Sequence, residues 1–83
     1  MAVIVETTPN PAARKFTVGV PVGGPATFTT GQEADAWVVA ILRLPGVASL
    51  FFTADFVTVT GGAGVDWEAI IPDIVSTLDA AFA

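Results

Sequence analysis

The stretch GVASLFFTADFVTVTGGAGVDWEAIIPDI, residues 46–74, shows the order of structural elements more clearly than any other part of the chain. Residues 47–53 and 56–60 are two segments rich in β-branched and aromatic residues. Ala54 and Asp55 separate them, and aspartate is a residue that suits a turn. A glycine-rich connection at 61–64 follows, and the apolar spacing then changes from that of a strand to that of a helix. The stretch predicts a β-hairpin followed by a helix.

The predicted hairpin has two unlike faces, because alternate residues of a strand point to the same side of a sheet. An even-length turn at Ala54 and Asp55 keeps the alternation consistent between the two strands. The predicted core face is apolar: Leu50, Phe52, Val57 and Val59. The opposite, solvent face is rich in threonine but carries two phenylalanines: Ser49, Phe51, Thr53, Phe56, Thr58 and Thr60. This register places Phe51 and Phe56 diagonally, within reach of each other.

The last helix is predicted to begin after Asp66, since aspartate is a favoured N-cap. Glu68 in the first turn suits the positive end of the helix dipole. Pro72 lies on the polar side, where water can satisfy the carbonyl that loses its hydrogen bond. The apolar residues form one stripe: Trp67, Ile70, Ile71, Ile74, Val75, Leu78 and Phe82.

The first half of the chain adds two strands and a helix. Residues 2–8 and 14–20 are predicted to be antiparallel strands, separated by a proline-containing loop, and 26–29 are compatible with a short extra strand. Thr30 to Glu33 match a capping box and predict a helix from there to about Leu44. Val39 lies on the polar side of that helix, opposite its apolar stripe: Ala34, Trp37, Val38, Ile41 and Leu44.

These elements predict an α+β fold in the order β-β-α-β-β-α. We expect a two-layer sandwich, in which an antiparallel sheet of about four strands carries two helices on one face. The 83 residues are expected to form a single domain, 1–83.

Composition excludes several classes of function. The net charge of −5 disfavours nucleic acid, which is bound by neutralising phosphates, and it disfavours anionic membrane surfaces. The longest apolar run, residues 36–42, is far shorter than the roughly 20 residues of a membrane-spanning helix. The N-terminal sequence has no basic region or cleavage site of a signal peptide, so we expect a cytoplasmic protein.

Catalysis and metal binding are also disfavoured by the residue types present. The chain has no histidine and no cysteine, so it lacks the usual base of a nucleophilic triad and the thiolate ligands of metal sites. Asp66 and Glu68 are better explained by helix capping than as a catalytic pair. The glycines at 61–64 lack the lysine and hydroxyl of a phosphate-binding loop and are expected to be a flexible connection. We expect no enzyme activity, no cofactor and no metal.

Two features are candidates for contact with a protein partner. The loop TPNPAARKF, residues 8–16, places Asn10 beside the adjacent cations Arg14 and Lys15, which are either a polar anchor for a partner or simply solvated. Phe51 and Phe56 on the threonine-rich face either meet a partner or only stiffen the hairpin.

Three motifs together resemble one known family. TPNPAARKF at 8–16, LPGVASLFFTADFVTVT at 44–60 and GVDWEAIIPDI at 64–74 are similar in order and spacing to the N-terminal domain of Nfu/NifU-type iron–sulfur scaffold proteins. The resemblance covers the chain from about Val5 to Phe82. The family's Cys-x-x-Cys module, which holds the cluster, is missing from these residues.

The resemblance implies a non-catalytic accessory or protein-interaction domain in iron–sulfur cluster assembly or delivery, not itself a cluster scaffold. Its partner would be an assembly factor or a client protein. The alternative is a general peptide- or protein-binding adaptor that shares the fold and has no link to iron.

Overall fold

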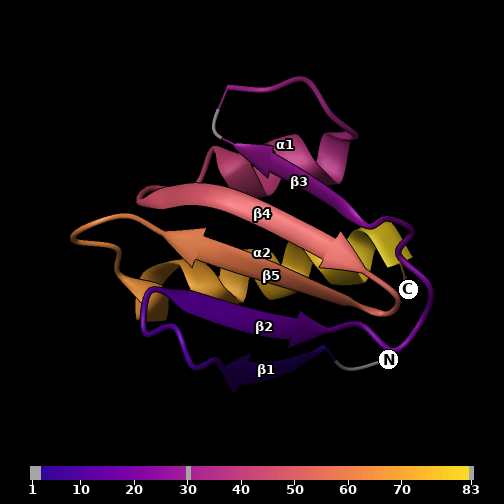
Figure 1. Cartoon of the computed structure of the whole chain (residues 1–83), viewed down its shortest axis with the longest axis horizontal. Coiled ribbons are helices and arrows are strands. Elements are labelled where there is room, and N and C mark those ends of the chain that lie inside the picture. The colour runs from indigo at the N-terminus through magenta and orange to yellow at the C-terminus, as the bar shows by residue number, and fades with distance from the viewer. Residues whose placement is uncertain (1–2, 30, 83) are drawn as a thin grey trace.

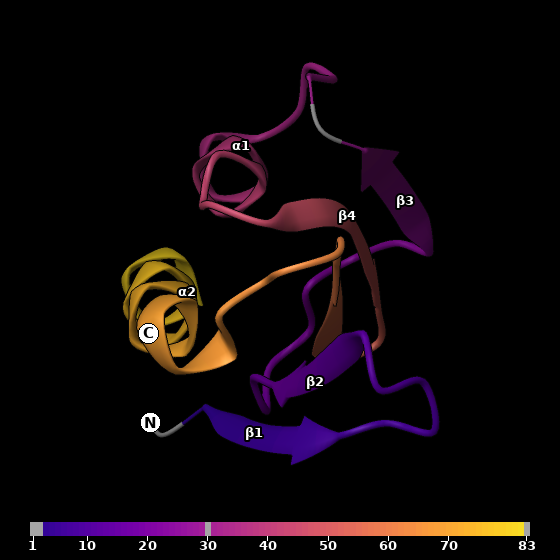
Figure 2. The same ribbon diagram turned by 90° about the vertical axis from the view of Figure 1, so that its left-hand side faces the viewer.

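The computed structural model describes residues 3–29 and 31–82. The observed order is β-β-β-α-β-β-α, with these bounds: β1 Ile4–Thr7, β2 Ala13–Thr17, β3 Ala26–Thr29, α1 Ala36–Leu42, β4 Val47–Thr53, β5 Phe56–Gly61 and α2 Trp67–Phe82. The strands form one antiparallel sheet, and both helices pack on the same side of it (Figures 1 and 2). The predicted α+β class and the placement of the helices are confirmed.

The sheet has five strands, so the prediction of about four strands in the order β-β-α-β-β-α was wrong. The additional strand is β3, which pairs with β4 and forms one edge in the spatial order β1-β2-β5-β4-β3. The suggestion of a short extra strand at 26–29 is confirmed, although four residues are too few to indicate where that strand pairs. Phe28 nevertheless faces the helices and stacks on Phe52, with a ring-centroid distance of 6.0 Å. This contact explains why so short a segment joins the sheet.

The hairpin of β4 and β5 has the predicted register. Leu50 pairs with Val59 and Phe52 with Val57 across a two-residue turn. Ala54 in this turn has a positive φ of 50°, which is unusual for a residue other than glycine. The carbonyl oxygens of the turn residues accept hydrogen bonds from the chain that leaves β2, including one of 2.8 Å from the Val18 amide to Asp55. The turn is thereby fixed against the β2–β3 connection.

The helix α1 begins later than predicted. Asp35 is its N-cap residue and makes no side-chain capping bond, and the helix ends at Leu42, before Pro45. Thr30, the first residue of the expected capping box, lies outside the described residues. The Gln32 side-chain oxygen accepts a hydrogen bond from the Thr29 hydroxyl at 3.0 Å. Residues 31–35 therefore form a connection and not a first helical turn.

The helix α2 agrees closely with its predicted pattern. An Asp66 carboxylate oxygen accepts a bond from the Ala69 amide at 3.4 Å, which is the capping geometry expected from sequence. Pro72 is exposed, as the polar-side assignment required. The buried residues of α2 belong to the predicted stripe: Ile70, Ile74 and Leu78.

One core lies between the sheet and the two helices. Its largest fully buried side chains come from β2, β4, β5 and both helices: Phe16, Ile41, Leu50, Ile74, Leu78, Val38, Val57 and Val59. Leu42 is also buried, although the predicted stripe of α1 omitted it.

The connection into α2 is fixed by close packing, although the glycines at 61–64 were expected to be a flexible link. The Gly62 amide donates to the Gly46 carbonyl at 2.7 Å. A Cβ atom on Gly46 would lie 2.9 Å from the Val65 Cα, and one on Gly61 would lie 2.6 Å from a Val65 methyl. Both glycines are therefore needed for Val65 to pack between them.

Candidate functional site

The side of the sheet away from the helices is not covered by either helix. Figure 2 shows both helices on one side of the strands and a free sheet surface on the other. Strand register places the same alternating set on this surface across all five strands. We call it the open face, and it comprises Ile4, Glu6, Lys15, Thr17, Thr27, Thr29, Ser49, Phe51, Thr53, Phe56, Thr58 and Thr60.

The two phenylalanines predicted to meet on this surface do so. The ring centroids of Phe51 and Phe56 lie 6.4 Å apart with a tilt of 55°. Both residues are half-buried. The Lys15 ammonium lies 4.6 Å from the centroid of Phe56, which is within range of a cation–π contact. Phe51, Phe56 and Lys15 thus form the centre of the open face.

Arg14 and Lys15, adjacent in sequence, are separated by the strand. Arg14 pairs with Val59 and points to the helix side, where its guanidinium lies 4.9 Å from the Trp67 ring centroid. The same guanidinium donates to the Pro11 carbonyl at 3.0 Å. Arg14 therefore connects the β1–β2 loop to the start of α2. The structure does not bring the two cations together as one anchor.

Asn10 has a visible role inside its loop. Its side-chain oxygen accepts a hydrogen bond from the Ala12 amide at 3.0 Å, and its carbonyl accepts one from the Thr8 hydroxyl at 2.8 Å. The Ala13 amide donates to the same carbonyl at 3.0 Å. These bonds shape the turn between β1 and β2. A role of Asn10 in binding a partner stays a prediction.

The edge strand β1 exposes apolar side chains. Val5 pairs with Phe16, so the two residues share a face of the sheet. Phe16 is fully buried, but Val5 is 37% exposed because β1 is the outermost strand. Ile4 is 58% exposed on the open face. Strand order decides these exposures, and the sequence gives no direct signal for it.

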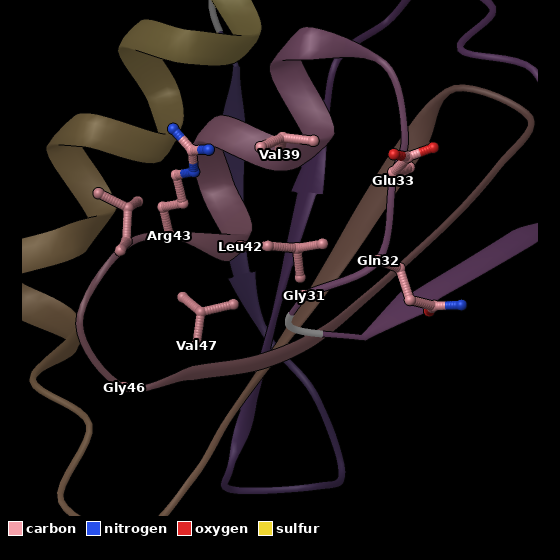
Figure 3. A pocket seen from close by; sticks show the side chains of 9 residues that line it. Gly31, Gln32, Glu33, Val39, Leu42, Arg43, Gly46 and Val47 are labelled. Atoms are coloured by element: carbon pink, nitrogen blue, oxygen red, sulfur yellow. The ribbon is translucent and has the colours of Figure 1, made fainter.

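A second feature is a hollow of about 630 Å³ beside α1, lined by the segment before the helix, the helix itself and the start of β4 (Figure 3). Val39, Leu42 and Val47 supply apolar side chains to it, and Arg43 and Glu33 lie at opposite sides. The hollow was missed from sequence. Its one signal was Val39, an apolar residue on the polar side of the predicted helix, and the structure explains that position.

Charged residues are not gathered for metal binding. Across residues 3–29 and 31–82, no group of three or more carboxylates lies close enough together to hold a metal ion. Within the same ranges, no helix is both long and apolar enough to cross a membrane. The chemistry offered by the described surface is therefore contact through aromatic, hydroxyl and single charged groups.

The fold defines an α+β domain in which an antiparallel sheet carries both helices on one face and leaves its other face open. Residues 3–83 match the family model described as "Scaffold protein Nfu/NifU N terminal". The chain belongs to this family.

Curated relatives and a solved structure agree with this assignment. A Homo sapiens protein named "NFU1 iron-sulfur cluster scaffold homolog, mitochondrial" is 36% identical over 83 residues, which cover 94% of this chain and 33% of that protein. "NifU-like protein 5, mitochondrial" from Arabidopsis thaliana is 35% identical, with 94% and 30% covered. The chain thus spans about a third of the length of these relatives. The crystal structure of protein SAV1430 from Staphylococcus aureus superposes with a TM-score of 0.77 at 27% identity, covering 93% of this chain and 98% of that one.

Proposed function

We propose that this domain is a non-catalytic protein-interaction module in iron–sulfur cluster assembly or delivery. In this role it binds an assembly factor or a client protein and does not itself hold the cluster. The relatives named as iron–sulfur cluster scaffolds support the link to this process. The residue types support the accessory role, because the chain offers neither thiolate nor imidazole ligands.

The observation that carries the proposal is the centre of the open face. Phe51 and Phe56 form a half-buried aromatic pair on a surface that the helices leave free, and Lys15 lies over one of the rings. Aromatic residues are enriched at the centres of protein interfaces, and rings with few rotatable bonds lose little entropy on binding. The surrounding threonine hydroxyls can form a polar rim. We propose Lys15, Phe51 and Phe56 as the contact residues, with Asn10 and Arg14 shaping the neighbouring loop.

The relatives cited above carry "mitochondrial" in their names. The cytoplasmic location expected from the sequence stays a prediction.

An affinity capture experiment tests the proposal. The tethered domain and a Phe51→Thr/Phe56→Thr double variant are incubated with the same cell extract, and captured proteins are identified by mass spectrometry. We expect iron–sulfur assembly factors or clients to be enriched by the parent domain and lost from the folded double variant. Capture of proteins without any link to iron would favour the general adaptor instead. Equal capture by both domains would show that the open face is not the contact surface.

A further inference from the structure

We propose that the open face also binds a second copy of this chain, in a face-to-face dimer whose two-fold axis runs along β5. This proposal rests on the proposed function in one respect: both take the open face as the surface that is free to bind a protein. In the absence of a partner the second copy covers the aromatic pair, and a partner must displace it.

The distribution of charge favours this face for self-association. Two copies that each carry a net charge of −5 repel one another, so they approach most easily where charge is balanced. Among the described residues of the open face, Glu6 is the one acid and Lys15 the one base. The remaining acids lie before α1, in the β4–β5 turn, or at the start of α2 and along it: Glu33, Asp35, Asp55, Asp66, Glu68, Asp73 and Asp79.

The strand register makes the open face complementary to itself. Thr58 on the central strand β5 lies between Lys15 on β2 and Phe51 on β4 in one cross-strand row. A two-fold rotation about an axis along β5 exchanges the two sides of that row. Lys15 of each copy then faces Phe51 of the other. Since its ammonium already lies over Phe56 in its own chain, the cation ends between two aromatic rings.

The same rotation brings no like charges together. Thr58 and Phe56 lie on β5 and face their own counterparts, and Glu6 on β1 faces Thr27 of the second copy on β3. An axis across the strands would instead place Glu6 opposite Glu6 and Lys15 opposite Lys15. Juxtaposed like charges disfavour an interface. Charge therefore selects the axis along β5.

The size of the face sets the strength of the dimer. Five strands spaced about 4.8 Å apart and three residue rows about 7 Å apart give a face of roughly 500 Å² per copy. The total of about 1,000 Å² lies at the low end of specific interfaces, among weak and transient ones. We expect reversible association that depends on concentration, with a Kd of about 10 µM to 1 mM.

Sedimentation equilibrium of the isolated chain tests the association. The average mass is expected to rise from 8.5 kDa toward twice that value as concentration increases to about 1 mM. Lys15→Glu is expected to weaken association at least tenfold. Arg43→Glu makes the same change of charge at the end of α1 and is expected to have a much smaller effect. A chain that stays monomeric throughout, or equal losses in the two variants, would overturn the proposal.

Cross-linking tests the axis. The chain has no cysteine, so a single introduced cysteine reacts alone. Thr58→Cys lies on the proposed axis and should be joined to its counterpart by a short bismaleimide. Thr27→Cys lies four strand spacings, about 19 Å, from its own counterpart and should not be joined. The reverse pattern, or equal yields, would refute this dimer. The capture experiment above uses a different readout, so either proposal can fail while the other stands.

Discussion

Replacing Ile74 by alanine should remove a large part of the stability of this domain. Ile74 is fully buried in α2 and lies in the core between the helices and the sheet. The change deletes three carbon atoms, which at about 0.8 kcal/mol each corresponds to roughly 2.5 kcal/mol of lost hydrophobic transfer energy. The cavity left behind adds about 1–2 kcal/mol, depending on how far the core relaxes. We expect a total loss of about 3.5–4.5 kcal/mol.

That loss is large for a chain of this size. An 83-residue domain is expected to have a free energy of unfolding of roughly 4–12 kcal/mol. In urea titrations followed by circular dichroism, the variant should unfold at a clearly lower midpoint with an unchanged slope. Ser76→Ala, an exposed change in the same helix, is the matched control and should alter stability by less than about 0.5 kcal/mol. A loss below about 1 kcal/mol for Ile74→Ala would show that α2 does not hold the core as described.

Three further predictions concern metal binding and the backbone. After anaerobic reconstitution with iron and sulfide, followed by chromatography, the chain should retain far less than one iron per molecule, because it has no thiolate or imidazole ligand. A stable stoichiometric cluster would contradict the accessory role. Gly46→Ala should lower the free energy of unfolding by about 2–4 kcal/mol in thermal melts, because the added Cβ would meet Val65 and the φ of Gly46 is 86°. Gly64→Ala is the control: its φ is 81° but the space around it is open, so the loss should be only about 1–2 kcal/mol. Equal losses in the two variants would exclude the packing effect. Ala54→Gly should stabilise the hairpin by about 0.5–1 kcal/mol because it relieves the positive φ, and a lower melting temperature would contradict this.

The parts of the fold that were predictable are those in which local pattern and packing agree. The sequence of Trp67–Phe82 predicts an N-cap, an apolar stripe and a proline on the solvent-facing side, and all three are found in α2. The β4–β5 hairpin was predictable to the level of individual pairs, because alternation on both strands allows one register only. The meeting of Phe51 and Phe56 followed directly from that register.

The parts that were not predictable depend on contacts between distant segments. The sequence could not show whether Lys15 shares a face with Phe56, because that requires knowing that β2 pairs with β5. Residues 26–29 were correctly named as a possible short strand, but the pairing of β3 with β4 and its one aromatic contact could not be predicted from four residues. The hollow beside α1 is likewise made by three segments, and its one indication in the sequence was the apolar Val39 on the polar side of the predicted helix.

The strand order has a consequence for how the chain folds during synthesis. The first hairpin, β1 and β2, joins the sheet through β5, which follows β2 by about forty residues in the sequence. β3 likewise depends on β4, so neither the β1–β2 hairpin nor β3 can join the rest of the sheet until the last hairpin has left the ribosome. Phe16 must remain without its core until then. The hairpin of β4 and β5, whose contacts are local and form in microseconds, is therefore the expected nucleus, and both edges add to it afterwards.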